Sequence, residues 1–465
     1  MSTDRLSPLD ASFLHIEDGV SHMHIGTVAL FEGPQPPFTD FVAMVEAKLP
    51  LVPRYRQVVQ FVAFDLGRPV WVDDPHFDLE YHLRRTALPA PGGDTELRTL
   101  VGRVMSQPLD RSKPLWEIWV VEGLQHGRWA MVAKTHHAMV DGIAGTDLLA
   151  VIMDLSPDGL RPEATAWTPG PTPTAGQLVA ESLLNVVRSP YEQLRAVQAS
   201  TEAIRHALSH AAEVGRGVVA MTGLVRATPV SSLNGPIGPH RRYAWATTSV
   251  DDVKKVRQSL GGTFNDVVLA AITNGFRQLL LSRGEESDRV VRTLVPVSVR
   301  PRDASGKAVG DGTFQNKLSA MFAELPVNLE DPIERLHAIT HQMEGLKESK
   351  QAVAGEALTS MSGFAPPMLL ALGMRLATRA AQHNVNTVTT NVPGPQFPLY
   401  AAGRKMLRAF PYVPLGGQIR IGIAIFSYNG EVNFGITGDY DCTGDLDVLS
   451  GAIEAGMAQM VTLTR

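Results

Sequence analysis

The chain has 465 residues, of which 44% are hydrophobic and 19% are charged, with a formal net charge of −5 and a single cysteine, Cys442. This composition is typical of a folded globular protein, and its negative charge argues against nucleic-acid binding. One cysteine excludes an internal disulfide framework and a cysteine-based metal cluster. The first residues lack a basic segment followed by an apolar core, and no apolar run is long enough to span a membrane. We therefore expect a cytoplasmic protein.

The first half of the chain alternates predicted strands and helices. Residues that favour β structure predict strands over 22–33 and 128–137. Apolar residues at helical spacing predict helices over 39–49 and 145–155. Five prolines within 156–174 indicate a linker, and helical spacing then runs from 175 to about 224.

The second half restarts this alternation after an irregular stretch. A helix is predicted over 250–260, with Asp251 or Asp252 near its N-terminal cap. Tyr428–Glu431 contains an Asn-Gly pair, which predicts a tight hairpin turn. Strands are predicted over 243–250, 292–300, 406–415, 419–430 and 431–440. We predict an α/β protein with an N-terminal domain over 1–160, a linker and helical crossover over 161–235, and a C-terminal domain over 236–465.

The segment THHAMVDGIAG, residues 135–145, concentrates titratable side chains at the end of a predicted strand. Neighbouring side chains on a strand point to opposite faces, so His136 and His137 are not expected to bind one metal ion. A histidine at a strand end can instead face a cleft and act as a general base, because its ordinary pKa is about 6.5. A purely structural role for both histidines is the alternative. Gly142 suits a tight turn or a close approach to substrate.

Other catalytic signatures are missing from the sequence. It contains no Gly-x-Ser-x-Gly nucleophile elbow, phosphate-binding loop or dinucleotide-binding fingerprint. Cys442 lies in a late, turn-like stretch rather than near a helix N-terminus. A catalytic histidine would therefore deprotonate a substrate hydroxyl or amine directly.

Several motifs resemble those of bacterial wax ester synthase/diacylglycerol acyltransferases. HHAMVDG matches the His-His-x-x-x-Asp-Gly motif of the wider superfamily, which includes chloramphenicol acetyltransferase and peptide-synthetase condensation domains. The Pro-Leu-Trp, Asn-Asp and Asn-Val-Pro-Gly-Pro motifs point to the narrower family. Segments that match in order are Leu6–Asp18, Met23–Gly33, Arg111–Leu124, Leu233–Ala244, Thr263–Ala271, Leu294–Arg300, Asn391–Pro395 and Phe426–Asp439.

The resemblance implies a fold and an activity. The fold would be two chloramphenicol acetyltransferase-like domains of mixed sheet plus helices, joined by a crossover linker, with the active site at the domain interface. The activity would be acyl-CoA-dependent O-acyl transfer, giving triacylglycerol from diacylglycerol or wax ester from a fatty alcohol. Acyl-CoA would be a co-substrate, and no cofactor or metal is expected. A carrier-protein-dependent condensation-type enzyme and a non-catalytic lipid-binding relative are the alternatives.

The resemblance also implies roles for individual residues. His137, the second histidine, would be the base that takes the acceptor hydroxyl proton, and His136 would orient the loop or pack within it. Asn265 would donate to the oxyanion or position substrate, with helix capping as its alternative role. Asp141 would pair with an arginine, for which Arg300 is the candidate. Further predictions are structural support from Gly142, Pro114, Leu115 and Trp116, and substrate contacts from Thr390 and Asn391.

Two positions depart from the family pattern, and one segment has two interpretations. Thr390 replaces the usual serine, and Gln315 precedes Asn316 where glycine is common. Both changes put the acceptor preference in question rather than the base. The apolar stretch Gly363–Ala381 predicts either a buried interdomain helix or a helix that contacts a membrane or lipid droplet. Water-insoluble substrates favour some peripheral association with a lipid surface.

Overall fold

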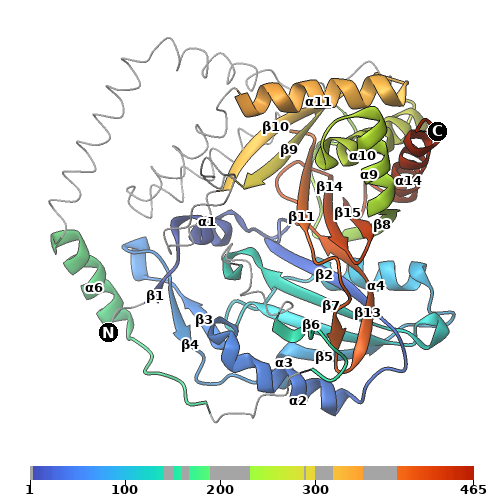
Figure 1. Ribbon diagram of the computed structural model, residues 1–465. Coiled ribbons are helices and arrows are strands. Elements are labelled where there is room, and N and C mark those ends of the chain that lie inside the picture. Colours follow the sequence, from blue (N-terminus) through green and yellow to red (C-terminus); the bar gives the residue numbers. More distant parts are fainter. Residues whose placement is uncertain are drawn as a thin grey trace, which may run out of the picture.

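The computed structural model describes residues 4–140, 151–159, 167–188, 231–286, 290–298, 318–348 and 385–464. Within these ranges the chain forms two six-stranded sheets and one three-stranded sheet, with helices packed against them (Figure 1). This arrangement confirms the predicted α/β class. No helix in the described part of the chain is long and apolar enough to cross a membrane.

The first large sheet carries the histidine motif. Its pairs are antiparallel except for β5 and β6, and His24 on β2 lies opposite His136 on β7. Its strands, in spatial order, are β12 (Tyr400–Ala401), β13 (Arg404–Tyr412), β2 (His24–Phe31), β7 (Trp129–His136), β6 (Trp116–Glu122) and β5 (Leu83–Ala87).

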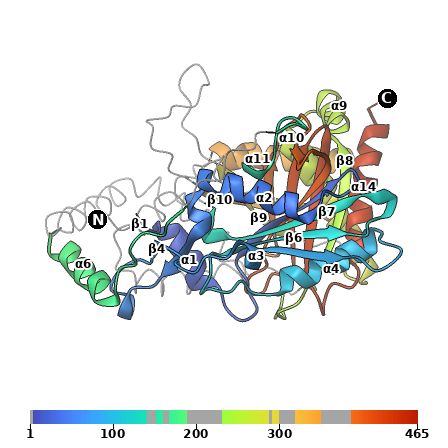
Figure 2. The ribbon, with the colours of Figure 1, turned by 90° about the horizontal axis from the view of Figure 1, so that it is seen from below.

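Two helices cover opposite faces of this sheet (Figure 2). On one face, α2 (Phe38–Lys48) places Phe41 edge-on against Trp129, which is fully buried. On the other face, α4 (Asp94–Ser106) packs Val101 and Val104 into a second apolar cluster. Shorter helices α1 (Pro8–Ile16) and α3 (Leu79–His82) lie near the ends of the strands. Burial of these apolar faces drives the layers together.

The second large sheet belongs to the C-terminal half. β11 runs parallel to both β9 and β14, and the other pairs are antiparallel. Its strands, in order, are β10 (Leu318–Leu325), β9 (Val291–Ser298), β11 (Thr387–Pro393), β14 (Ile421–Tyr428), β15 (Glu431–Asp439) and β8 (Arg241–Ser249). The helices on this half are α9 (Val250–Leu260), α10 (Phe264–Ser282), α11 (Pro332–Glu348) and α14 (Leu446–Thr462).

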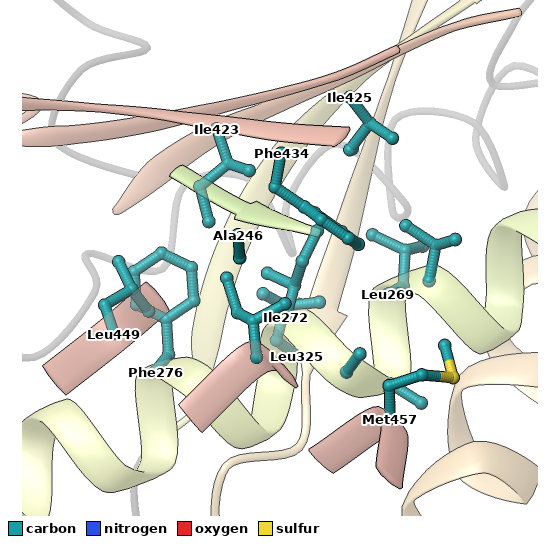
Figure 3. Close-up of a cluster of buried hydrophobic side chains, with 14 of the residues drawn as sticks. Ala246, Leu269, Ile272, Phe276, Leu325, Ile423, Ile425, Phe434, Leu449 and Met457 are labelled. Carbon is teal, nitrogen blue, oxygen red and sulfur yellow. The ribbon is translucent and has the colours of Figure 1, made fainter. Parts of the chain in front are cut away.

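The core of this half lies between its sheet and α10 and α14. Phe276 and Leu269 of α10 meet Ile423 and Phe434 from the sheet, all with 1% exposure or less (Figure 3). Met457 of α14 joins the same cluster. α10 is therefore held from two sides, and its N-terminus has a defined position beside the sheet.

A small third unit packs beside the first sheet. It consists of β1 (Asp4–Arg5), β4 (Val70–Asp73) and β3 (Gln57–Gln60), covered by α6 (Ala175–Arg188). Val62, Val70 and Leu178 form its buried core. Short 3-10 turns occur at Leu49–Leu51, Pro53–Arg56, Ala63–Asp65, Gln125–Gly127 and His137–Met139.

The C-terminal half of the chain contributes strands to the first large sheet. β13 comes from the C-terminal half but pairs with β2 of the first sheet (Figure 1). A Cβ atom at Gly435 of β15 would overlap the carbonyl oxygen of Pro411, so β15 and β13 are in direct contact. The predicted division at 160 and 235 stays a prediction, but the 236–465 segment contributes β12 and β13 to the N-terminal sheet.

Most elements predicted from local sequence patterns are present in the structure. The strands predicted at 22–33 and 128–137 and the 428–431 hairpin are confirmed, and Asn429 and Gly430 both have positive φ, 46° and 87°. The acidic pair predicted near the cap of α9 is confirmed: Asp251 and Asp252 lie in its first turn, and the N-cap Ser249 accepts a hydrogen bond from the Asp252 N–H at 2.9 Å. Most of the helix predicted at 145–155, the helical pattern beyond 188 and the Gly363–Ala381 segment lie outside the described residues.

Candidate active site

The histidine segment forms a tight turn at the end of β7. Two backbone hydrogen bonds, and a third from the backbone to the His136 ring, hold this turn in place. The His136 N–H donates to the Leu115 carbonyl at 2.9 Å, and the His137 N–H donates to the Met23 carbonyl at 2.8 Å. The Ala138 N–H donates to Nδ1 of His136 at 3.0 Å. The turn is therefore fastened to both neighbouring segments of the sheet.

The two histidine side chains have separate surroundings. His136 is 1% exposed, and its Nε2 lies 3.5 Å from Oε2 of Glu17. The His137 ring stacks on Phe13 of α1, with ring centroids 3.9 Å apart and an interplanar angle of 22°. Because the rings contact different partners, each has its own chemical environment.

His137 lies in a desolvated position. Burial lowers its pKa to about 4, helped by the nearby His136 and opposed by a backbone interaction. Its Nδ1 is buried and has no hydrogen-bond partner among the described residues. At neutral pH the imidazole is therefore uncharged, which is the form that accepts a proton.

Glu17, just after α1, is a site residue that the sequence patterns did not single out. Burial of its carboxylate raises its pKa, but hydrogen bonds and charge attraction from His136 and Arg111 outweigh burial and lower it to about 2. Arg111 donates to Oε2 from Nε at 3.0 Å and from Nη2, and the Met23 N–H donates to Oε1 at 3.3 Å. Glu17 therefore joins α1 to Arg111, to Met23 before β2 and to His136 of the histidine turn. Its position within the matching Leu6–Asp18 segment was the available signal.

The Pro-Leu-Trp motif, residues 114–116, packs against the histidine turn and supports it. Leu115 and Trp116 are each 1% exposed, and Leu115 supplies the carbonyl that receives the His136 N–H. Nε1 of Trp116 donates to the Tyr55 carbonyl at 2.8 Å, and the indole stacks on His82 at 4.4 Å. A buried tryptophan with its N–H paired suits a rigid supporting position.

Asn265 and Asn391 contact each other. Nδ2 of Asn391 donates to Oδ1 of Asn265 at 3.3 Å, which brings together the start of α10 and the end of β11. Thr263 caps α10, with its Oγ1 accepting from the Asp266 N–H at 3.3 Å, so capping is not the role of Asn265. Thr390 pairs with Ala424 on the neighbouring strand. No hydrogen bond among the described residues joins this pair to His137.

Other predicted site residues fall outside the described ranges. Asp141, Gly142 and Arg300 are among them, as are Gln315 and Asn316. Their predicted roles stay predictions.

The second half of the molecule meets the segment that precedes β2. The Gly417 N–H donates to Oγ of Ser21 at 3.4 Å, and Nη2 of Arg241 donates to the Val20 carbonyl. A Cβ atom at Gly416 would lie 3.2 Å from Cε of Met23, whose carbonyl holds His137. The histidine turn therefore lies beside the junction between the two halves of the chain.

Comparison with known proteins identifies the family. Residues 6–268 match the wax ester synthase/diacylglycerol acyltransferase catalytic domain, and residues 314–461 match the C-terminal domain of the same family. The chain is 37% identical to the probable diacylglycerol O-acyltransferase tgs1 of Mycobacterium tuberculosis, over 99% of this chain and 96% of that protein.

Solved structures give the same picture. The wax ester synthase/diacylglycerol acyltransferase from Marinobacter aquaeolei VT8 superposes with a TM-score of 0.68 at 26% identity, over 99% of each chain. The first condensation domain of the calcium-dependent antibiotic synthetase shares the fold at 16% identity, with a TM-score of 0.55 over 100% of this chain and 96% of that one. This chain belongs to the wax ester synthase/diacylglycerol acyltransferase family.

Proposed function

We propose that this chain is an acyl-CoA-dependent O-acyltransferase that forms neutral lipid, triacylglycerol from diacylglycerol or wax ester from a long-chain alcohol. The observation that carries the proposal is His137: an uncharged imidazole, stacked on Phe13 and fastened by its backbone to Met23, in a chain that matches both domains of this family.

His137 acts as the general base in this reaction. An imidazole nitrogen takes the hydroxyl proton of the acceptor while the hydroxyl oxygen attacks the thioester carbonyl carbon. The tetrahedral intermediate then collapses, the carbon–sulfur bond breaks, and the proton passes from His137 to the leaving thiolate of CoA. Acyl-CoA is consumed as a co-substrate, and the balanced reaction needs no bound cofactor. General base catalysis of this kind typically contributes about 10²–10⁴-fold in rate.

The oxyanion of the intermediate requires a fixed hydrogen-bond donor. Asn265 is the residue we assign to this role, because Asn391 occupies its Oδ1 and thereby directs its Nδ2 away from that contact. Removing such a donor typically costs about 2.7–4 kcal/mol of transition-state stabilisation. Thr390 contributes to the wall beside this pair. Asp141, paired with Arg300, braces the loop that follows His137.

Contact with a lipid surface is the second part of the proposal, since both acceptor classes are insoluble in water. Three large apolar side chains of the small third unit, Phe61, Leu66 and Leu184, are 40%, 41% and 47% exposed. Gly67 lies against Ser182 of α6, so the β3–β4 connection and this helix form one surface. Exposed apolar side chains on one surface favour peripheral binding to a membrane or lipid droplet.

The direct test supplies labelled palmitoyl-CoA with either diolein or hexadecanol to the purified full-length chain. We expect labelled triacylglycerol or wax ester, and we expect His137→Ala to abolish it while the variant unfolds cooperatively. Folded wild-type protein that makes neither product would overturn the proposal. Product from a carrier-protein thioester but not from palmitoyl-CoA would instead favour the condensation-type alternative.

A further inference from the structure

Two cavities open beside α4, and they have opposite electrostatic character. The larger, about 950 Å³, is lined by five carboxylates and two arginines. The smaller, about 600 Å³, lies between α4, the start of β8 and the turn after β15, and is lined by four arginines and one carboxylate. We call this second cavity the arginine pocket; its arginines are Arg98, Arg103, Arg241 and Arg242. On a chain with a net charge of −5, it is a local concentration of positive charge.

The guanidinium groups of the arginine pocket are not all neutralised by the protein. Its single carboxylate, Asp447, pairs with Arg98 at 2.8 Å. Arg103 is exposed, and no described residue forms an ion pair or hydrogen bond with it. Of the Arg242 guanidinium nitrogens, only Nε donates a hydrogen bond to a described residue, to the Tyr440 carbonyl at 2.7 Å. Donors therefore remain free for an anion, and arginine binds phosphate oxygens especially well.

An aromatic surface lies at the same pocket. Tyr440 is 46% exposed, and the Arg242 guanidinium sits 4.1 Å from its ring centroid. The ring of His240 meets Tyr440 edge-on at 6.3 Å. A planar base can stack against such a group while its phosphates contact the neighbouring arginines.

Arg241, at the arginine pocket, contacts the segment that supports the histidine turn. Arg241, 3% exposed, donates to the carbonyls of Gly238 and His240 on one side and of Val20 on the other. Val20 belongs to the short segment that ends at Met23, whose carbonyl holds the His137 backbone. A ligand in the pocket is therefore close to the segment that supports the base.

We propose that the arginine pocket binds the nucleotide end of the acyl donor, the adenosine 3′-phosphate 5′-diphosphate of CoA. The inference rests on the proposed function, because that function supplies the nucleotide. The pocket volume falls in the range of about 300–1,000 Å³ that is typical of small-molecule sites. Phosphates contact Arg103 and Arg242, the base stacks beside Tyr440, and the pantetheine arm runs past Arg241 toward His137.

The kinetic test compares two donors that share a thioester and differ in the nucleotide, palmitoyl-CoA and S-palmitoyl pantetheine. Arg103→Glu is the main variant, because this exposed and unpaired side chain is not needed for folding. We expect the ratio of kcat/KM for palmitoyl-CoA to that for S-palmitoyl pantetheine to fall about ten-fold or more, the effect of losing one charged hydrogen bond. Arg242→Gln should lower the same ratio. The control, Arg85→Ala with Arg128→Ala, removes two surface arginines outside the pocket and should keep the wild-type ratio.

A binding test separates failure of this inference from failure of the proposed function. Calorimetry with adenosine 3′,5′-bisphosphate should show binding to the wild type that Arg103→Glu weakens about ten-fold or more. Binding without turnover of either donor would support the pocket and contradict the activity. Turnover with an unchanged donor ratio in both variants would place the nucleotide elsewhere. If Arg103→Glu weakens binding to phosphatidylglycerol vesicles and leaves the donor ratio unchanged, the pocket takes a lipid phosphate instead and the inference is overturned.

Discussion

Oε2 of Glu17 lies 3.5 Å from Nε2 of His136, so the carboxylate faces the ring of the first histidine. Nδ1 of His136 accepts the Ala138 N–H, so in the neutral ring the proton resides on Nε2 and faces the carboxylate. Arg111 compensates the remaining charge of Glu17. The ring of the first histidine is thereby held in one orientation, and its Nδ1 in turn fixes the turn that contains His137.

We predict that Glu17→Gln lowers kcat about 10- to 100-fold with little change in KM, because small displacements of a catalytic group cost that much. The free energy of unfolding should fall by about 1–3 kcal/mol, the cost of weakening a largely buried charged contact. Steady-state kinetics and thermal unfolding measure the two effects. The control Glu122→Gln breaks the exposed pair with Arg85 and should change stability by less than about 1 kcal/mol. A Glu17→Gln enzyme with wild-type kcat would show that Glu17 is structural only.

The same pair predicts a pH dependence of stability. The pKa of Glu17 is about 2 in the folded protein and 4.5 ordinarily, so the unfolded chain binds the proton more tightly. The contribution of Glu17 is fully present above pH 4.5 and is lost as the pH falls toward 2. In urea unfolding series, the stability difference between wild type and Glu17→Gln should be constant from pH 7 to 5 and shrink below 4.5. A constant difference down to pH 3.5 would contradict the lowered pKa.

The pH–rate profile should report the environment of His137. Because its pKa is lowered to about 4, the acid limb of kcat/KM should lie well below the ordinary histidine value of 6.5. Phe13→Ala removes the ring stacked on the imidazole and admits water, which favours the charged form and should move the acid limb upward. Circular dichroism at each pH checks that the protein stays folded. An acid limb at 6.5 in the wild type would mean that His137 is solvated.

Asn265 and Asn391 should be coupled in catalysis. We predict that Asn265→Ala lowers kcat about 10²–10³-fold, as expected for loss of an oxyanion donor. Asn391→Ala should lower kcat less, because it leaves the Asn265 amide in place and removes only the hydrogen bond that orients this amide. In the Asn265→Ala background, Asn391→Ala should have almost no further effect, and a double-mutant cycle measures this coupling. Additive effects of the two substitutions would contradict a joint role.

The contact between β13 and β15 of the second sheet should be sensitive to a single methyl group. Gly435→Ala places a Cβ atom on the Pro411 carbonyl, and we expect a loss of about 1–3 kcal/mol or more, since backbone atoms cannot move aside cheaply. Gly451→Ala, at an exposed position of α14, meets open space and should stabilise by about 0.5–1 kcal/mol. Melting temperatures compare the two. Equal melting temperatures would mean that β13 and β15 are not held together as described.

Local sequence patterns were sufficient for much of the fold. Alternating and helical spacing located β2, β7 and the β14–β15 hairpin, because each pattern reflects one buried face within a few residues. The motif around His137 also predicted a base from local sequence, because the histidines, the aspartate and the glycine all lie within one short segment. The start of α9 was found in the same way, since Asp251 and Asp252 lie in its first turn, directly after the N-cap Ser249.

The relationships that build the site depend on tertiary structure. Glu17 and Arg111 are 94 positions apart, and Asn265 and Asn391 are 126 apart. β13 reads as one of three consecutive strands, yet it pairs with β2 of the other sheet. No spacing of residues along the sequence signals such contacts. They form only when separate apolar faces pack together and bring distant polar groups within hydrogen-bonding distance. The sequence by itself determined the elements and the family and predicted His137 as the base; packing decided which side chains surround that histidine.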